Sequence, residues 1–309
     1  MRTFARLMMA AVTGVLVVVS GHTAAAAPLA HTQFSPLSSS PEPQGVQAAG
    51  AELADGVTGA VRWSRQANTR APMGSITKVM TALVVINEGN LDRPVTVPGG
   101  IIAYDNKYGA STANLVPGEV LTARQLLYAL LLPSGCDAAY TLADAYGPGQ
   151  GAFIGKMNGT AARLGLRNTH FTDPSGLPAP DGYSTYSTPA DLVALGRHAM
   201  GLPVFRDIVR QPTYHVAPGP ANRDHVWNTT NRLVRDYPGT TGIKTGSTDA
   251  AGTCLLFEAV RAGVPLIGVV LHSSPDDDGV AAADAQRMLT WGYGPIVGAL
   301  PLSAQLMLR

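Results

Sequence analysis

Strand-like segments lie at both ends of this 309-residue chain, and helical patterns fill the part between them. Short alternating runs at 51–55 and 59–63 flank a glycine and predict a hairpin. Three further strand-like runs follow late in the chain, at 240–245, 253–260 and 264–272. A chain whose two ends share one antiparallel sheet, with helices inserted between them, has an α+β architecture in two subdomains.

The helical segments carry their own start signals. Thr122 and Gln125 form a capping box, which opens the apolar helix 126–132. Residues 187–191 combine a Ser or Thr cap with an early proline and an early acid, which is typical of a helix start. The other helices are expected at 75–87, 137–146, 153–164 and 279–291.

The first residues predict a secretory signal peptide. Arg2 and Arg6 precede an apolar run at 7–19, and a small-residue cleavage site ends the segment, so we expect residues 1–26 to be removed. Thirteen apolar residues are few for a stable membrane span, although a retained N-terminal anchor is the alternative. The sequence therefore predicts an extracytoplasmic, secreted protein that associates with the cell wall and has no stable membrane anchor.

The mature chain divides into three parts. A flexible leader is expected at 27–46, because this stretch is rich in Pro and Ser, and a short tail at 295–309. The domain proper is expected at 47–294. Within it, 47–90 and 205–294 would form the sheet subdomain and 91–204 the mainly helical subdomain.

Composition excludes several classes of function. Charged residues make up only 14% and the formal net charge is +1, so no electrostatic footprint for nucleic acid is present. The seven histidines are scattered, and Asp276–Asp278 lacks the glycine and distal glutamate of a calcium loop. We therefore expect no metal and no cofactor. Only four lysines occur: Lys78, Lys107, Lys156 and Lys244.

Two of these lysines lie in motifs that suggest chemistry. Ser75 and Lys78 are three residues apart, which places both side chains on one helical face, and a neutral Lys can serve as the base that a serine nucleophile needs. Lys244, Thr245 and Gly246, followed by Ser247, lie on an expected strand, where glycine permits close approach of a ligand. Alone, each motif also fits a polar surface.

A third motif, Ser134-Gly135-Cys136, follows the capped helix. The three motifs, in this order on helix, loop and strand, resemble the Ser-x-x-Lys, Ser-x-Asn and Lys-Thr-Gly triple of penicillin-binding proteins and serine β-lactamases. The wider pattern is similar to the D-alanyl-D-alanine carboxypeptidase family of low-molecular-mass penicillin-binding proteins over roughly residues 47–294. The segments that carry this wider likeness begin at Leu53, Met80, Asp137, Phe153, Tyr183, Asn228 and Thr248.

The resemblance implies a β-lactamase/DD-peptidase-like fold and an acyl transfer reaction. Ser75 would attack the D-Ala-D-Ala end of a peptidoglycan stem peptide, Lys78 would accept its proton, and Ser134 would relay that proton to the leaving nitrogen. The substrate would be held by Lys244, Thr245, Gly246, Ser247 and Cys136. The backbone N–H groups of Ser75 and Ser247 would form the oxyanion hole. β-Lactam antibiotics would acylate Ser75, and we expect a monomer.

The chain departs from the common family pattern at Cys136, where asparagine is usual. A small secreted DD-transpeptidase branch shares Ser-Gly-Cys, so the change need not mean inactivity. The chain is also expected to lack the second domain and amphipathic anchor of many relatives. A disulfide between Cys136 and Cys254 is conceivable in a secreted protein. We predict two free thiols instead, with Cys254 buried and Cys136 partly accessible, because a bridge needs Cα atoms within about 7 Å.

Two alternatives to a D-Ala-D-Ala carboxypeptidase or transpeptidase stay open. A class A β-lactamase needs a glutamate that activates water for deacylation. The chain has five glutamates, and none lies between Cys136 and Lys244, where such a loop would be. A non-catalytic wall-binding homologue is the other alternative, although Ser75, Lys78 and Lys244 are all present.

Overall fold

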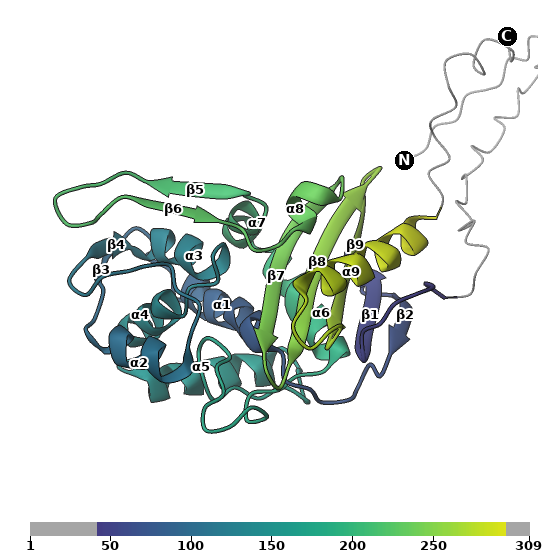
Figure 1. The fold of residues 1–309 in the computed structure, drawn as a ribbon, viewed down its shortest axis with the longest axis horizontal. Helices are drawn as coiled ribbons and strands as arrows, with labels where there is room; N and C mark the ends of the chain where they lie inside the picture. The colour runs from purple at the N-terminus through teal and green to yellow at the C-terminus, as the bar shows by residue number, and fades with distance from the viewer. Residues whose placement is uncertain (1–41, 295–309) are drawn as a thin grey trace, which may run out of the picture. The chain divides into compact units, whose positions relative to one another are not determined.

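The computed structural model describes residues 42–294 (Figure 1). The strands of its main sheet are β1 (Gly50–Asp55), β2 (Val61–Arg65), β7 (Thr240–Thr248), β8 (Gly252–Arg261) and β9 (Val264–Leu271). All neighbours pair antiparallel, in the order β2-β1-β9-β8-β7. In the β1–β9 pair, Gly50 lies opposite Leu271 and Asp55 opposite Leu266. The predicted α+β fold, with one antiparallel sheet built from both chain ends, is confirmed.

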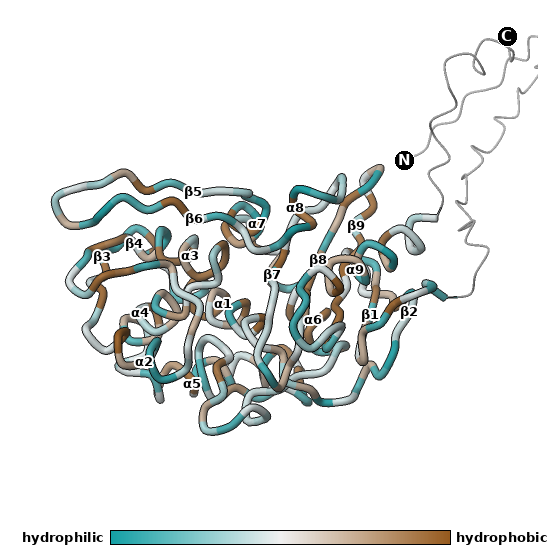
Figure 2. The backbone as a smooth tube through the Cα atoms, in the orientation of Figure 1, coloured by the Kyte–Doolittle hydropathy of each residue, from teal (hydrophilic) through white to brown (hydrophobic). Residues whose placement is uncertain are grey.

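Helices cover both faces of this sheet, with α9 (Asp278–Tyr293) on one face and α6 (Pro189–Met200) on the other (Figure 1). The side chains of β8 alternate between the two faces, as the strand period requires. Phe257 belongs to the apolar cluster under α9, whereas Leu256 lies against Gly196 of α6. Since both faces are covered, β8 and β9 are hydrophobic along much of their length (Figure 2).

The other helical elements are η1 (Gly74–Thr77, a 3-10 turn), α1 (Lys78–Glu88), α2 (Gly100–Tyr108), α3 (Ala123–Leu131), α4 (Cys136–Tyr146), α5 (Gln150–Arg163), α7 (Pro203–Val209) and α8 (Leu233–Asp236). Helix α1 is central to them, because it contacts α3, α4, α5, α6 and α7. Its first eight residues, Lys78 to Val85, are all buried. The helix that carries Lys78 is therefore enclosed by its neighbours, while Ser75 lies just before it.

The expected helix caps are present. The Thr122 side chain accepts from Gln125 N at 3.1 Å, and Gln125 Oε1 accepts from Thr122 N at 2.8 Å, which completes the capping box of α3. At α6 the Thr188 side chain accepts from Asp191 N at 3.2 Å, with Pro189 in the first turn. These bonds satisfy backbone donors that a helix start leaves without partners.

Several elements were not expected from the sequence. Besides α2 and α7, the structure contains the strand pair β3 (Pro94–Thr96) and β4 (Val120–Thr122) and the hairpin β5 (Thr213–Val216) and β6 (His225–Asn228). The hairpin packs on the helical part of the domain, where Tyr214 stacks on Tyr128 with ring centroids 3.6 Å apart. This contact joins residues 86 positions apart, so local sequence pattern does not reveal it.

The signal segment, most of the leader and the C-terminal tail lie outside the described residues. At the end of the expected leader, Val46 is only 7% exposed, and its carbonyl accepts from Arg65 Nη1 at 2.9 Å. Packing therefore begins within the last residues of that segment. Between residues 42 and 294, no helix combines the length and the apolar character that a bilayer crossing requires.

Candidate active site

Ser75 and Lys78 form a close pair at the start of α1. Lys78 Nζ lies 2.7 Å from Ser75 Oγ, and Lys78 is fully buried. Ser75 itself lies in the 3-10 turn η1, so the expectation that it opens an α-helix is corrected: α1 begins at Lys78. The amine makes no ion pair within residues 42–294. A neutral amine at this distance can accept the hydroxyl proton of Ser75.

The loop between α3 and α4 and the first residue of α4 supply the next two groups. Lys78 Nζ lies 3.4 Å from Ser134 Oγ and 3.2 Å from Cys136 Sγ. Ser134 has a φ of 66°, in the left-handed region that non-glycine residues rarely adopt. Ser111 holds this backbone in place, because its hydroxyl donates to Ser134 O at 2.8 Å and its carbonyl accepts from Cys136 N at 2.8 Å. Such local strain is common at functional sites.

Strand β7 forms the opposite side of the site. It is one of the two edge strands of the sheet, and it packs against η1. A Cβ on Gly246 would collide with Met73 O, and a Cβ on Gly74 would lie 2.7 Å from Ser247 N. These two glycines allow the backbone of Ser247 to approach the turn that carries Ser75.

Lys244 belongs to β7, and its side chain is almost fully buried. Its Nζ donates to Thr245 O at 3.0 Å and lies 3.4 Å from Thr245 Oγ1. Burial is the main cause that holds the pKa of Lys244 well below its usual range, and the positive charge of Lys78 lowers this pKa further. Thr245 Oγ1 also lies 2.6 Å from Thr230 Oγ1. The buried amine therefore lies directly behind a pair of hydroxyls.

These groups surround an open cleft of about 520 Å³. Of the predicted site residues, Ser75, Ser134, Cys136, Thr245, Gly246 and Ser247 line it. Lys78 and Lys244 lie behind its wall, 0% and 1% exposed. The structure thus brings all the predicted site residues to one cleft, from η1, α1, the α3–α4 loop, the start of α4 and β7.

The two cysteines differ from the expectation in one respect. Both are free thiols, and Cys254 is buried as expected, with burial raising the pKa of its thiol to about 12. Cys136, however, is only 1% exposed, so the prediction that it is partly accessible is wrong. Its sulfur is enclosed because it faces Lys78 and because the hydroxyl of Ser111 lies 3.7 Å away.

Some residues at the site were not found by sequence reasoning. Gly176, Leu177 and Pro178 line the cleft, and Ser175 O accepts from Lys78 Nζ at 3.3 Å. The Asp-Pro-Ser-Gly run at 173–176 signals a turn and nothing more. Thr230 falls in a segment that carries only the family likeness. No group of three or more His, Cys, Asp or Glu within residues 42–294 is arranged to hold a metal ion.

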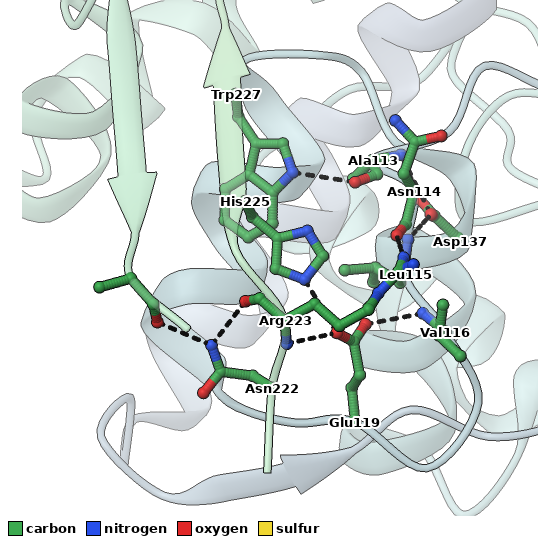
Figure 3. A network of polar contacts seen from close by, with 11 residues as sticks. Ala113, Asn114, Leu115, Val116, Glu119, Asp137, Asn222, Arg223, His225 and Trp227 are labelled. Carbon is green, nitrogen blue, oxygen red and sulfur yellow. Dashed lines mark hydrogen bonds and ion pairs between the residues drawn. The ribbon is translucent and has the colours of Figure 1, made fainter. Parts of the chain in front are cut away.

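A buried polar network supports the loop that carries Ser111 (Figure 3). Glu119 accepts from Val116 N at 2.7 Å, from Arg223 N at 2.8 Å and pairs with His225 at 3.1 Å. Burial raises the pKa of Glu119, but the two backbone donors and His225 outweigh burial and leave this pKa below its ordinary value. This network fastens the β5–β6 hairpin to the loop after α2.

Asp137 holds the same loop from the other side. Its carboxylate accepts from Ala113 N at 2.9 Å and from Leu115 N at 3.0 Å, while Trp227 Nε1 donates to Ala113 O at 2.9 Å (Figure 3). Burial raises the pKa of Asp137, although these backbone donors oppose the increase. The wall of the cleft that contacts Cys136 is therefore fixed through several buried hydrogen bonds.

Comparison with known proteins gives a consistent result. The family model described as D-alanyl-D-alanine carboxypeptidase, Peptidase_S11, matches residues 37–274. The chain is 39% identical to a D-alanyl-D-alanine carboxypeptidase of Streptomyces sp. strain K15, over 80% of this chain and 88% of the relative. It is 38% identical to a D-alanyl-D-alanine carboxypeptidase of Mycobacterium tuberculosis, over 78% of this chain and 80% of the relative.

Solved structures agree with this result. The crystal structure of the Streptomyces K15 DD-transpeptidase superposes with a TM-score of 0.75 at 39% identity, over 80% of this chain and 97% of that one. A penicillin-binding protein homolog from Mycobacterium tuberculosis gives a TM-score of 0.75 at 35% identity, over 84% of this chain and 95% of that one. The chain therefore belongs to the D-alanyl-D-alanine carboxypeptidase family and is a serine-type enzyme of that family.

Proposed function

We propose that this enzyme acts on peptidoglycan stem peptides that end in D-Ala-D-Ala, through an acyl-enzyme on Ser75. The observation that carries the proposal is the position of Lys78 Nζ, within 2.7 Å of Ser75 Oγ and 3.4 Å of Ser134 Oγ at the wall of the cleft. A base in hydrogen-bond reach of the serine hydroxyl is what acyl transfer by serine requires, and the second hydroxyl offers a route for the proton to the leaving group.

Acylation begins with Ser75 Oγ attacking the carbonyl carbon of the penultimate D-Ala. Lys78, when its amine is in the neutral form, takes the hydroxyl proton as the new C–O bond forms. The backbone N–H groups of Ser75 and Ser247 stabilise the negative charge on the substrate oxygen, a contribution commonly worth about 3 kcal/mol for each donor. Collapse of this intermediate breaks the C–N bond to the terminal D-Ala.

Ser134 completes the proton transfer. Its hydroxyl passes a proton to the leaving nitrogen and recovers one from Lys78, so the terminal D-Ala departs as a neutral amine. The acyl group then transfers to water in a carboxypeptidase reaction or to an amine in a transpeptidase reaction. In either reaction Lys78 accepts the proton of the incoming nucleophile.

The hydroxyl pair of Thr245 and Thr230, backed by Lys244, is suited to the terminal carboxylate of the substrate. Hydroxyls can donate to carboxylate oxygens, and the buried amine gains a counter-ion when the carboxylate binds. Gly246 lines the cleft, and its lack of a side chain lets β7 pack against the turn that carries Ser75. We assign the substrate-binding role to Lys244, Thr245, Gly246 and Ser247, with Cys136 at the side of the nucleophile.

β-Lactams would acylate the same Ser75, since their ring carbonyl replaces the D-Ala carbonyl. A β-lactamase function is less well supported, because the residues lining the cleft within 42–294 include no glutamate that could activate water. The carboxylates that do line it are Asp249 and Asp278. Incubation with a fluorescent penicillin separates the two functions: a stable adduct supports the DD-peptidase, and rapid turnover supports the β-lactamase.

We further propose that the protein works outside the cytoplasmic membrane, as a monomer associated with the cell wall. The support for this location is the sequence of residues 1–26, which has the features of a signal peptide. The substrate lies in that compartment as well.

Product analysis tests the proposed activity. The purified enzyme is incubated with a D-Ala-D-Ala peptide, with and without an amine acceptor, and the products are measured by mass spectrometry. Release of D-Ala in water, or an amide product with the acceptor, supports the proposal. An unchanged peptide under both conditions contradicts it.

A further inference from the structure

The segment that follows His170 is organised around the carboxylate of Asp173. Asp173 Oδ1 accepts from Ser175 N at 2.8 Å, from Gly176 N at 2.8 Å and from Leu177 N at 3.0 Å. The same oxygen accepts from Ser175 Oγ at 2.7 Å. Asp173 is only 4% exposed and makes no ion pair within residues 42–294. A single buried carboxylate thus fixes the backbone of the loop 173–177.

Tyr104 of α2 holds this carboxylate from its other oxygen. The Tyr104 hydroxyl donates to Asp173 Oδ2 at 2.7 Å and lies 2.6 Å from Ser175 Oγ. Burial, followed by the negative charge of Asp173, raises the pKa of Tyr104 well above its usual value. The phenol therefore keeps its hydrogen and stays a donor to Asp173.

The loop 173–177 packs directly on the segment that carries the nucleophile and the base. Thr81 Oγ1 donates to Pro174 O at 2.5 Å, and Lys78 Nζ donates to Ser175 O at 3.3 Å. A Cβ on Gly176 would collide with Gly74 O, so the two backbones are in contact there. The carboxylate of Asp173 thus sets where the Ser175 carbonyl lies relative to the Lys78 amine.

The Ser175 carbonyl differs chemically from the other partners of Lys78. A carbonyl oxygen can only accept, whereas Ser75 and Ser134 can donate or accept. A neutral amine has two hydrogens and one lone pair. When Ser175 O takes one of the hydrogens, fewer orientations of Nζ remain, and the lone pair can be directed at the Ser75 hydroxyl. General-base catalysis depends on this alignment.

We propose that Asp173, braced by Tyr104, is a positioning residue that orients the Lys78 amine through the Ser175 carbonyl. The inference rests on the proposed function, because it assigns a role within the acylation of Ser75. Asp173 is not among the residues that line the cleft and makes no hydrogen bond to Ser75 within residues 42–294, so it acts through the loop backbone.

The test measures acylation by a fluorescent penicillin under single-turnover conditions, at several concentrations, so that the acylation rate constant and the binding constant of the antibiotic are separated. Asp173→Asn keeps the shape of the side chain but replaces one acceptor oxygen with a donor that opposes the Tyr104 hydroxyl. Tyr104→Phe removes only that hydroxyl. Tyr140→Phe is the matched control, because Tyr140 packs against Tyr104 at 5.1 Å and its hydroxyl makes no hydrogen bond within residues 42–294.

We expect the acylation rate constant to fall on the order of 100-fold in Asp173→Asn, as for a small misplacement of a catalytic group. Tyr104→Phe should lose roughly tenfold for the same reason. The binding constant should stay unchanged in both, and Tyr140→Phe should behave as the wild type. Because Tyr104 acts through Asp173, the double variant should be no slower than Asp173→Asn alone.

Three results would overturn the inference. They are an unchanged acylation rate constant in a folded Tyr104→Phe enzyme, weaker binding with an unchanged rate constant, and an equal loss in Tyr140→Phe. If Asp173→Asn does not fold, Tyr104→Phe decides the question alone. Failure of the proposed function is a different result, because then the wild-type enzyme itself would not be acylated at Ser75.

Discussion

Replacing Gly176 with alanine should destabilise the enzyme and slow its acylation at the same time. Gly176 has a φ of 85°, and an added Cβ would collide with Gly74 O and lie 2.6 Å from Thr77 Oγ1. The positive φ costs an L-residue about 1–2 kcal/mol. Overpacking against a fixed backbone adds about 1–3 kcal/mol. We therefore expect the free energy of unfolding to fall by about 2–5 kcal/mol, out of the total of about 5–15 kcal/mol that is typical of a domain.

The chain offers a matched control for the conformational part of this loss. Gly165 has a φ of 74°, and a Cβ there would meet nothing within 4 Å. Gly165→Ala should therefore cost only the positive-φ contribution, about 1–2 kcal/mol. The difference between the two variants isolates the contact between the loop 173–177 and η1.

Urea unfolding followed by circular dichroism measures the stability of both variants, and single-turnover acylation by a fluorescent penicillin measures the site. A Gly176→Ala enzyme that still folds must move the loop away from Gly74, which carries the Ser175 carbonyl away from Lys78. Its acylation should be slower than that of Gly165→Ala. Equal stability and equal acylation rates in the two variants would refute the claimed close contact.

Lys78→Arg should reduce the acylation rate by roughly 10²–10⁴-fold, because a guanidinium stays charged and cannot accept a proton; a near-normal single-turnover rate would mean that another group is the base. Burial lowers the pKa of Lys244 in the folded enzyme, so the folded state binds fewer protons than the unfolded state between that lowered pKa and the usual lysine value. Stability should therefore rise with pH across this window, and Lys244→Met should flatten the rise in urea unfolding at a series of pH values; an unchanged slope would contradict the burial argument. The pKa of Glu119 is lowered in the folded state, so its contribution is present above the unfolded pKa and is lost as the pH falls through the folded pKa. Glu119→Gln should cost about 1–3 kcal/mol at neutral pH and less at acid pH, and an equal loss at both pH values would argue against the charged network.

The sheet and most of the long helices could be predicted because their apolar periodicity and caps are local signals. Thr122 and Gln125 form their capping box, and β7, β8 and β9 begin within a residue of the expected runs. Helix α2 was missed because Ile101 is its one buried residue, so its sequence carries no apolar stripe of helical period. The β5–β6 hairpin was missed because its stability comes from distant contacts such as Tyr214 on Tyr128.

The active site also has a part that the sequence predicts and a part that depends on contacts between distant residues. The order of the Ser75, Ser134 and Lys244 motifs, together with the family likeness, was enough to expect them around one cleft. The contribution of the loop 173–177 could not be expected, because the group that meets Lys78 is a backbone carbonyl, and every residue has one. The burial of Cys136 was missed because the position of Ser111 depends on a loop that follows the unexpected helix α2.

The most direct test of the account is the identity of the residue that penicillin modifies. The purified enzyme is incubated with benzylpenicillin, digested, and the modified peptide is sequenced by mass spectrometry. The account predicts one adduct, on Ser75, that disappears in Ser75→Ala. An adduct on any other residue, or labelling that persists in Ser75→Ala, would contradict the assignment of Ser75 as the nucleophile.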